Sequence, residues 1–213
     1  MKMTACTCGV SATIILALGA VLLPAAAPAP QDPAPQAPAS ATAFQIDPVH
    51  STSIFRVHHL GAGLFHGMFD NVTGTVQYDP ENPEALSFDV VIDVESVHTG
   101  SHDMNTNLNN HLMSPDFFNA KEHPKMTFKS SSVKKTGEDV YEATGDLTIR
   151  GNTRTITANV RFTGMARSRG GARAGFLATF EIDRTDYEVS YMADSPMLGK
   201  NVQITVVIEG MSG

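Results

Sequence analysis

From residue 44 to the C-terminus, apolar and polar residues alternate with a period close to two. Residues 88–95 run Phe-Asp-Val-Val-Ile-Asp-Val-Glu, and residues 202–209 run Val-Gln-Ile-Thr-Val-Val-Ile-Glu. A β-strand points successive side chains to opposite faces of its sheet, so each run has one apolar and one mostly polar face. The pattern predicts a sheet that buries one face. It recurs at residues 53–58, 125–129 and 176–183.

Turn-forming residues separate these runs and indicate about eight strands. Proline, glycine, asparagine or aspartate cluster at residues 79–83, 136–139 and 151–152, and a longer glycine-rich stretch covers residues 164–175. Such clusters are typical of hairpins and loops. Closing the sheet removes its edges and leaves room for one small ligand, which favours a barrel over a sandwich. The sequence therefore predicts an all-β fold, an antiparallel eight-stranded lipocalin-like barrel.

A single segment, residues 102–120, is predicted to be a helical insertion in this barrel. It contains the octapeptide 111–118, in which Ser114 is suited to cap a helix and Pro115 to occupy its first position. A closed sheet needs a lid or plug when its interior holds more than side chains. Apolar residues recur at helical spacing at Leu108, Leu112 and Met113.

The first 43 residues are predicted to be targeting and linker segments. Lys2 precedes an apolar run over residues 14–23 and then small residues, which is typical of a secretory signal peptide, here residues 1–27. The run is shorter than the roughly 20 residues that a membrane-spanning helix needs, so we expect no membrane span. Residues 28–43, rich in proline and alanine, are predicted to be a linker. One barrel domain, residues 44–213, follows in a periplasmic or secreted protein.

Charge and cysteine content limit the partners of this domain. Cys6 and Cys8 both lie in the leader, so the predicted domain has neither disulfides nor thiolate metal ligands. A formal net charge of −7 argues against binding to nucleic acid and against generic adhesion to an anionic membrane. The sequence leaves open whether the protein forms a homodimer.

Several motifs follow one another along the domain. They include residues 46–51 (Ile-Asp-Pro-Val-His-Ser), 55–60 (Phe-Arg-Val-His-His-Leu), 111–118 (His-Leu-Met-Ser-Pro-Asp-Phe-Phe), 145–151 (Gly-Asp-Leu-Thr-Ile-Arg-Gly) and 183–187 (Asp-Arg-Thr-Asp-Tyr). In this order they resemble the YceI-like family of lipocalin-like, polyisoprenoid-binding exported proteins. Three positions depart from the family pattern: Phe44 stands in place of a frequent Trp, Asn109-Asn110 in place of a charged pair, and Glu188 in place of a usual Gly.

The resemblance implies a barrel that holds a long isoprenoid, such as a prenyl phosphate or a quinone tail, in an apolar tunnel. Complete transfer of one five-carbon isoprene unit from water is worth about 4 kcal/mol, so several units bind firmly without a catalytic group. Core and cavity lining look identical in a sequence, so a secreted interaction module with a solid core remains an alternative. The expected ligand-binding residues are Phe55, Val57, Phe69, Phe88, Val90, Ile92, His111, Phe117, Phe118, Met126, Phe128, Leu147 and Phe180.

The eight histidines raise the question of a metal site. His58 and His59 must face opposite sides of one strand, and no spacing matches a recognised metal signature. We therefore expect no metal and no cofactor. His111 opens the central motif and is interpreted either as a polar contact to a ligand head group or as a structural histidine.

Two further clusters carry open alternatives. Arg167, Arg169 and Arg173 lie in the glycine-rich stretch, where they either meet an anionic head group at the barrel mouth or belong to a solvated loop. The acidic residues within 183–188 leave a hydrolytic enzyme as a further alternative, but no Gly-x-Ser-x-Gly motif or thiol nucleophile accompanies them. We expect a binding protein with no catalytic residues.

Overall fold

The computed structural model describes residues 41–100, 106–168 and 170–213. Its strands form one antiparallel sheet in the order β1-β4-β5-β7-β8-β9-β10-β11-β2-β3-β6, and an additional pairing of β1 with β11 closes the sheet on itself. The strands are β1 (Thr42–Ile46), β2 (Thr52–His59), β3 (Gly63–Phe69), β4 (Val72–Tyr78), β5 (Ser87–Asp93), β6 (Val97–His98), β7 (Lys125–Gly137), β8 (Val140–Ile149), β9 (Asn152–Ser168), β10 (Gly171–Asp183) and β11 (Leu198–Met211). The helices are α1 (Thr106–Met113) and the 3-10 turns η1 (Pro83–Ala85), η2 (Val94–Ser96) and η3 (Arg184–Tyr187).

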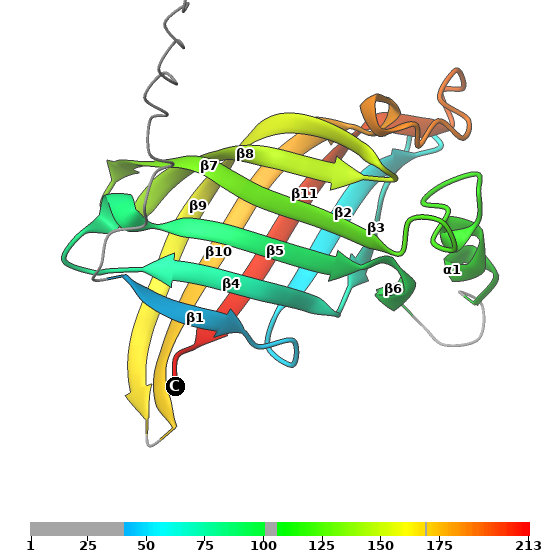
Figure 1. Ribbon diagram of the computed structural model, residues 1–213. Coiled ribbons are helices and arrows are strands. Elements are labelled where there is room, and N and C mark those ends of the chain that lie inside the picture. The colour runs from blue at the N-terminus through cyan, green and yellow to red at the C-terminus, as the bar shows by residue number, and fades with distance from the viewer. Residues whose placement is uncertain (1–40, 101–105, 169) are drawn as a thin grey trace, which may run out of the picture. The chain divides into compact units, whose positions relative to one another are not determined.

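Three pairs of consecutive strands act as single bent strands: β1 with β2, β3 with β4, and β5 with β6. β1 and β2 both pair with β11, and their other edges meet β4 and β3. β6 continues β5 beyond η2, so that β4 pairs with β5 while β3 pairs with β6. Together with β7 to β11 these three bent strands make a closed eight-stranded antiparallel barrel, which confirms the predicted fold class. Figure 1 shows the tilted strands, with α1 at one end of the barrel.

Two glycines allow the strands to bend where backbones approach closely. The register of β7 against β8 shifts between Ser130 and Ser132. A Cβ atom at Gly145 of β8 would collide there with the carbonyl oxygen of Lys129. Gly74 of β4 has φ +126°, and a Cβ atom at this position would collide with the carbonyl oxygen of Asp89 in β5. Because a bulge or a glycine bends a strand locally, these positions help the sheet to close.

The predicted helical insertion contains the helix α1. This helix ends just before Ser114, the residue that was expected to begin a helix. α1 stops at Met113, and Ser114 donates from its backbone N–H and from Oγ (2.7 Å) to the carbonyl oxygen of His111. Assigning Ser114 as an N-cap was therefore wrong. Pro115 disfavours helical geometry in the residue before it and has no N–H for the helical ladder. Residues 102–105 of the predicted span lie outside the described residues.

The glycine-rich stretch 164–175 is not a loop, contrary to expectation. β9 continues to Ser168 and β10 begins at Gly171, so the two strands form one long hairpin. Gly175 pairs with Gly164, and the register shifts between Gly175 and Phe176. Glycine marks a bulge within a ribbon here, which sequence alone does not distinguish from a turn.

The predicted signal peptide and most of the predicted linker lie outside the described residues. Of the linker residues 28–43, Thr42 and Ala43 already belong to β1. No helix in the described part of the chain is both long enough and apolar enough to span a membrane.

Two clusters of buried apolar side chains fill the ends of the barrel. The first gathers Phe44, Val76, Tyr78, Tyr141 and Phe176 with their neighbours, and we call it the closed-end cluster. The second gathers Phe69, Leu112, Phe117, Tyr187 and Val189 with their neighbours beneath α1, and we call it the mouth cluster. Inward-facing residues of the strands contribute to both clusters, so the space between them lies inside the barrel.

Candidate ligand-binding cavity

The barrel encloses a cavity of about 490 Å³. Its wall is almost entirely apolar, with contributions from β2, β3, β5, β7 to β11, α1 and the segment between η3 and β11. The interior is therefore not filled by side chains, which argues against the solid-core alternative. All thirteen residues expected at the ligand border the cavity: Phe55, Val57, Phe69, Phe88, Val90, Ile92, His111, Phe117, Phe118, Met126, Phe128, Leu147 and Phe180.

Strand register brings these residues together across the sheet. Val90 of β5 lies opposite Phe128 of β7, which in turn lies opposite Leu147 of β8. Phe55 of β2 lies opposite Ile204 of β11. Directly opposed residues of an antiparallel pair point to the same face. One period-two pattern in each strand therefore builds a continuous apolar wall.

Several lining residues were missing from the predicted set. Residues of β11 border the cavity, although the predicted set named none of them. Phe65, Tyr191 and Met192 also line it, from the β2–β3 hairpin and the segment after η3. The segment after η3 has no regular alternation of apolar and polar residues, so the sequence did not indicate which of its side chains face the cavity. The lining residues of β11 are Leu198, Val202, Ile204, Val206 and Ile208.

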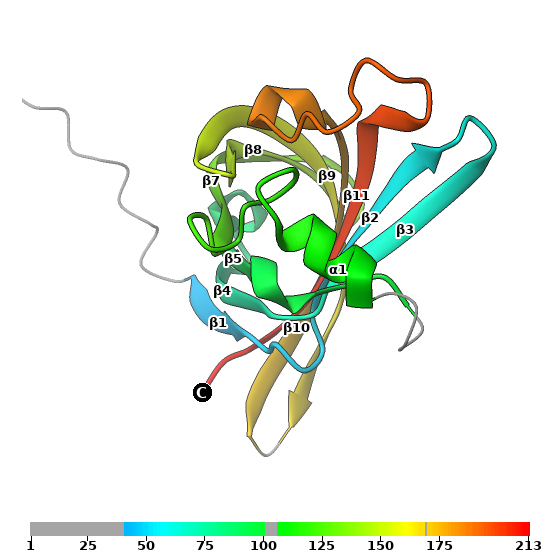
Figure 2. The ribbon, with the colours of Figure 1, turned by 90° about the vertical axis from the view of Figure 1, so that its right-hand side faces the viewer.

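Three aromatic rings meet at the end of the cavity beneath α1. The His111 ring makes edge contacts with Phe117 (centroids 5.0 Å apart) and Tyr191 (4.8 Å), and Phe117 lies 5.0 Å from Tyr191. Nε2 of His111 lies 3.0 Å from Oδ2 of Asp116. We call His111, Phe117 and Tyr191 the mouth triad. Figure 2 shows this end, where α1 lies across the opening beside the β2–β3 hairpin and the segment before β11.

A buried arginine fixes the segment that carries Tyr191. Arg184 is 5% exposed and donates from Nε to the carbonyl oxygen of Gly199 (2.8 Å) and from Nη1 to that of Val189 (2.6 Å). Nη2 donates to the carbonyl oxygen of Leu198 at 3.4 Å. Burial lowers the pKa of Arg184. The guanidinium clamps both ends of the segment, so Arg184 orders the mouth through backbone contacts.

Tyr187 is the buried polar residue of the wall that lacks a partner. Its side chain is 1% exposed, and within the described part of the chain its hydroxyl has no hydrogen-bond partner. Burial raises the pKa of this phenol. The hydroxyl is therefore neutral at physiological pH and is left with unused hydrogen-bonding capacity next to the cavity.

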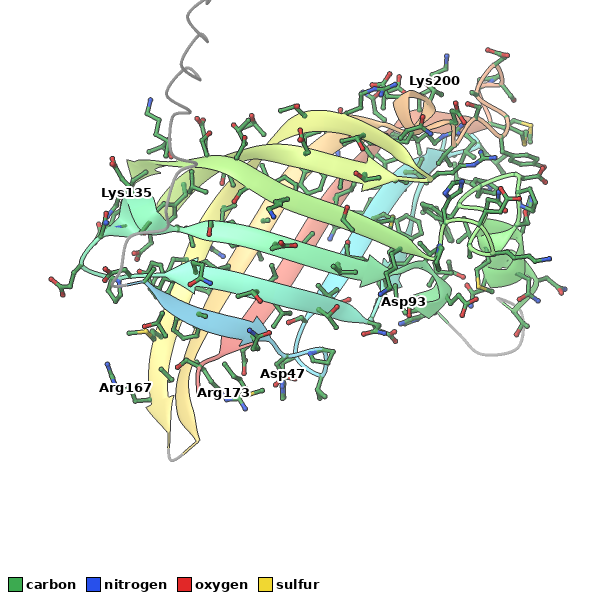
Figure 3. The ribbon with its side chains drawn as sticks, viewed as in Figure 1. Asp47, Asp93, Lys135, Arg167, Arg173 and Lys200 are labelled. Carbon is green, nitrogen blue, oxygen red and sulfur yellow. The ribbon has the colours of Figure 1, made fainter. Side chains whose placement is uncertain are left out.

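A polar network lies at the bend between β1 and β2, away from the mouth. Asp47 accepts hydrogen bonds from the backbone N–H of Val49 (3.0 Å) and from Arg173 (3.2 Å), and its Oδ2 lies 2.8 Å from Nδ1 of His50. Arg173 also pairs with Glu209. The hydrogen bond from His50 is the main reason why the pKa of Asp47 is lowered. We call these four side chains the Asp47 corner, and Figure 3 shows Asp47 and Arg173 close together there.

The Asp47 corner bears on the metal question and on the place of Arg173. Asp47, His50 and Glu209 are the one trio among the described residues close enough to share a metal ion, but Arg173 already supplies a cation to both carboxylates. Arg173 thus holds the bend and does not meet a head group at the mouth. Arg167 is exposed near the tip of the β9–β10 hairpin, and Arg169 lies outside the described residues.

The remaining histidines and acids do not converge on the cavity. His59 borders the cavity whereas its neighbour His58 does not, as the alternation requires. His98 lies 3.3 Å from Asp70. Asp183 caps η3 by accepting from the backbone N–H (2.8 Å) and the hydroxyl (2.6 Å) of Thr185, and these bonds lower its pKa. A capping role accounts for this carboxylate without catalysis.

Comparison with known proteins identifies the family of this chain. The family model of the YceI-like domain matches residues 44–210. The chain belongs to the YceI-like family. Protein YceI of Escherichia coli O6:H1 is 35% identical over 163 residues, which cover 76% of this chain and 82% of that protein.

Solved structures share the YceI-like barrel. The crystal structure of Burkholderia cenocepacia BcnA matches with a TM-score of 0.67 at 26% identity, covering 77% of this chain and 98% of that one. A polyisoprenoid binding domain from Saccharophagus degradans matches with a TM-score of 0.58 at 18% identity, covering 81% and 99%. At that identity the second match is a likeness of fold alone.

Three of the five YceI-like motifs fall at two places in this barrel. The motif at residues 46–51 forms the Asp47 corner, where Ser51 Oγ also accepts from the backbone N–H of Glu209 (3.0 Å). The motifs at residues 111–118 and 183–187 supply the mouth triad and the Arg184 clamp. Glu188, which replaces the usual Gly, has φ +59° in the left-handed region, where glycine is favoured.

Proposed function

We propose that the protein is an exported carrier that holds a long-chain isoprenoid, with a prenyl phosphate or quinone head, inside the barrel. The observation that carries the proposal is the apolar cavity of about 490 Å³, a volume typical of sites that enclose a small molecule. Family membership and the fold shared with a polyisoprenoid binding domain support it. Export is supported by the predicted signal peptide.

The energetic cost of an empty cavity supports occupancy. At about 24 cal/mol per Å³, a dry and sealed space of this size would cost about 12 kcal/mol. A whole domain is typically stable by only about 5–15 kcal/mol. An apolar chain that enters the space restores the missing contacts, and each isoprene unit adds about 4 kcal/mol of transfer free energy before ordering costs.

The lining of the cavity favours a protein that binds its ligand without reacting with it. Arg184 is the one permanently charged side chain among the described lining residues, and it is bonded to backbone carbonyl groups. The described lining residues include no aspartate, glutamate or cysteine. We therefore expect a bound lipid to be recovered unchanged.

Mass spectrometry of the protein purified from periplasm and culture medium tests the proposal. We expect a near-stoichiometric isoprenoid in the solvent extract and a matching mass increase in the native spectrum. Recovery from the exported fractions would also test the predicted signal. A protein that is empty and takes up no added prenyl lipid would contradict the proposal.

A pair of matched variants locates the lipid. Ala178 lines the cavity, so Ala178→Phe fills part of it with a side chain. Ala166 is exposed on β9, so Ala166→Phe is the control for the same change outside the barrel. We expect Ala178→Phe to retain the fold and lose at least about tenfold in bound lipid, because the ring displaces buried apolar contacts. Equal lipid in both variants would place the ligand elsewhere.

A further inference from the structure

Exposed apolar side chains gather at the mouth of the barrel. Six large hydrophobic side chains are exposed among the described residues, and four of them belong to the two segments beside the opening. Leu60 (53% exposed) and Leu64 (49%) lie on the β2–β3 hairpin, and Tyr191 (38%) and Met197 (46%) lie between η3 and β11. We call these four side chains the apolar rim. Contiguous apolar surface of this kind marks a site of interaction.

The two segments of the apolar rim are in contact, and three of its four side chains lead into the cavity. The backbone N–H of Leu60 donates to the carbonyl oxygen of Met197 (2.7 Å), so the two segments are in direct contact. Leu60, Tyr191 and Met197 also border the cavity. Figures 1 and 2 both show the hairpin and the segment before β11 projecting side by side at this end. The outer surface and the inner wall therefore form one apolar path.

The charge of the β2–β3 hairpin differs from that of the whole chain. Residues 48–69 contain no aspartate or glutamate, although the formal net charge of the chain is −7. Arg56 and four histidines are the ionisable side chains of this stretch. In the second segment Glu188 and Asp194 are exposed, and the exposed Lys200 follows near the start of β11. The hairpin therefore brings no carboxylate to a phospholipid surface.

We propose that the apolar rim docks on a phospholipid bilayer and lets an isoprenoid pass between the bilayer and the cavity. The docking stands on the rim itself, whereas the transfer rests on the proposed function. Leucine, methionine and tyrosine are side chains that enter the interfacial region of a bilayer. Contact there keeps the isoprenoid out of water during transfer, which removes the unfavourable hydration of its chain.

Vesicle flotation with the protein purified from expression of the full chain tests the docking. The vesicles contain phosphatidylcholine, with or without phosphatidylglycerol. The test variant is Leu64→Asp, because Leu64 is the rim side chain that does not border the cavity. Val49→Asp/Met165→Asp is the control because these residues are the two exposed hydrophobics away from the rim. We expect the test variant to bind vesicles at least about tenfold more weakly than the control, since Leu64 loses its apolar transfer and becomes charged.

A transfer assay separates the docking from the proposed function. Radiolabelled geranylgeraniol is supplied either within the vesicles or from ethanol. We expect the test variant to take up the ethanol-supplied probe as the unaltered protein does, and to extract the vesicle-borne probe at least about tenfold more slowly. If the unaltered protein floats with vesicles but takes up no probe by either route, the docking stands and the carrier function fails. Absence of flotation, or equal extraction of the vesicle-borne probe by the test and control variants, overturns the docking. The apolar rim would then be a binding surface for a protein partner.

Discussion

The Asp47 corner and the mouth triad close the barrel in different ways. At the corner, four ionisable side chains bind one another and join β1, β10 and β11. At the mouth, ring contacts of 4.8–5.0 Å and one histidine–carboxylate pair connect α1 to the segment before β11. Charged hydrogen bonds are directional and fix register, whereas ring contacts are weak and separate at modest cost. We therefore expect the contacts of the mouth to separate more readily than those of the corner.

The largest expected difference is one of stability, between the closed-end cluster and the mouth cluster. Phe176 is 1% exposed, and its ring lies 5.5 Å from Tyr78 and from Phe88 and 5.6 Å from Phe162. Phe176→Ala should lower the free energy of unfolding of the lipid-free protein by about 3–5 kcal/mol. Phe118 at the mouth is partly buried, so Phe118→Ala should cost about 1 kcal/mol. Urea titration measures both, and equal losses would break the contrast between the ends.

A pH-dependent difference comes next. Because the pKa of Asp47 is held below its ordinary value of 3.8, ionised Asp47 stabilises the fold above that pH, and this contribution is lost as the pH falls through the folded pKa. Asp47→Asn should lower the urea midpoint at pH 7 and make its decline towards pH 3 shallower. Asp194→Asn, exposed near the mouth, is the control and should leave the midpoint at pH 7 nearly unchanged. A variant that keeps the full acid decline of the unaltered protein would remove Asp47 from the account.

Sequence predicted the barrel and its wall because both follow from local alternation. The alternation of apolar and polar residues alone assigns Val90 and Phe128 to the apolar face of their strands, and both side chains border the cavity. The predicted count of about eight strands is also confirmed, because β1 with β2, β3 with β4 and β5 with β6 each form one bent strand. These features need only the nearest neighbours in the chain.

Other features depend on contacts that a single sequence does not express. Whether opposite walls meet or leave a cavity depends on strand tilt and stagger, which only closure of the sheet fixes. Arg173 was considered for the mouth because its glycine-rich surroundings resembled a loop, but its pairing partners Asp47 and Glu209 are far away in sequence. Tyr191 lies in a segment without a period, so its place in the mouth triad depends on the Arg184 clamp.

The mouth triad should control exchange of the ligand more than stability. His111→Ala removes two ring contacts and the pair with Asp116. At about 0.5–1.5 kcal/mol for each ring contact, we expect about tenfold faster release of a bound isoprenoid. His98→Ala is the matched control, since His98 also pairs with an aspartate, Asp70, but does not border the cavity. Stopped-flow measurement of isoprenoid transfer to acceptor vesicles gives the release rates. Equal rates in the two variants would show that the mouth triad does not control release.

The smallest expected effect tests the backbone beneath the mouth. Glu188 ends η3 with φ +59°, a left-handed conformation that costs a residue with a Cβ atom about 1 kcal/mol relative to glycine. Glu188→Gly should therefore raise the free energy of unfolding by about 0.5–1 kcal/mol, less the added entropy of the unfolded chain. Glu142→Gly, at an exposed extended position of β8, should lower it by a similar amount. Opposite signs for the same substitution would show that the family's usual glycine serves the backbone at this turn. A loss in both variants would instead mean that the Glu188 side chain contributes to the mouth.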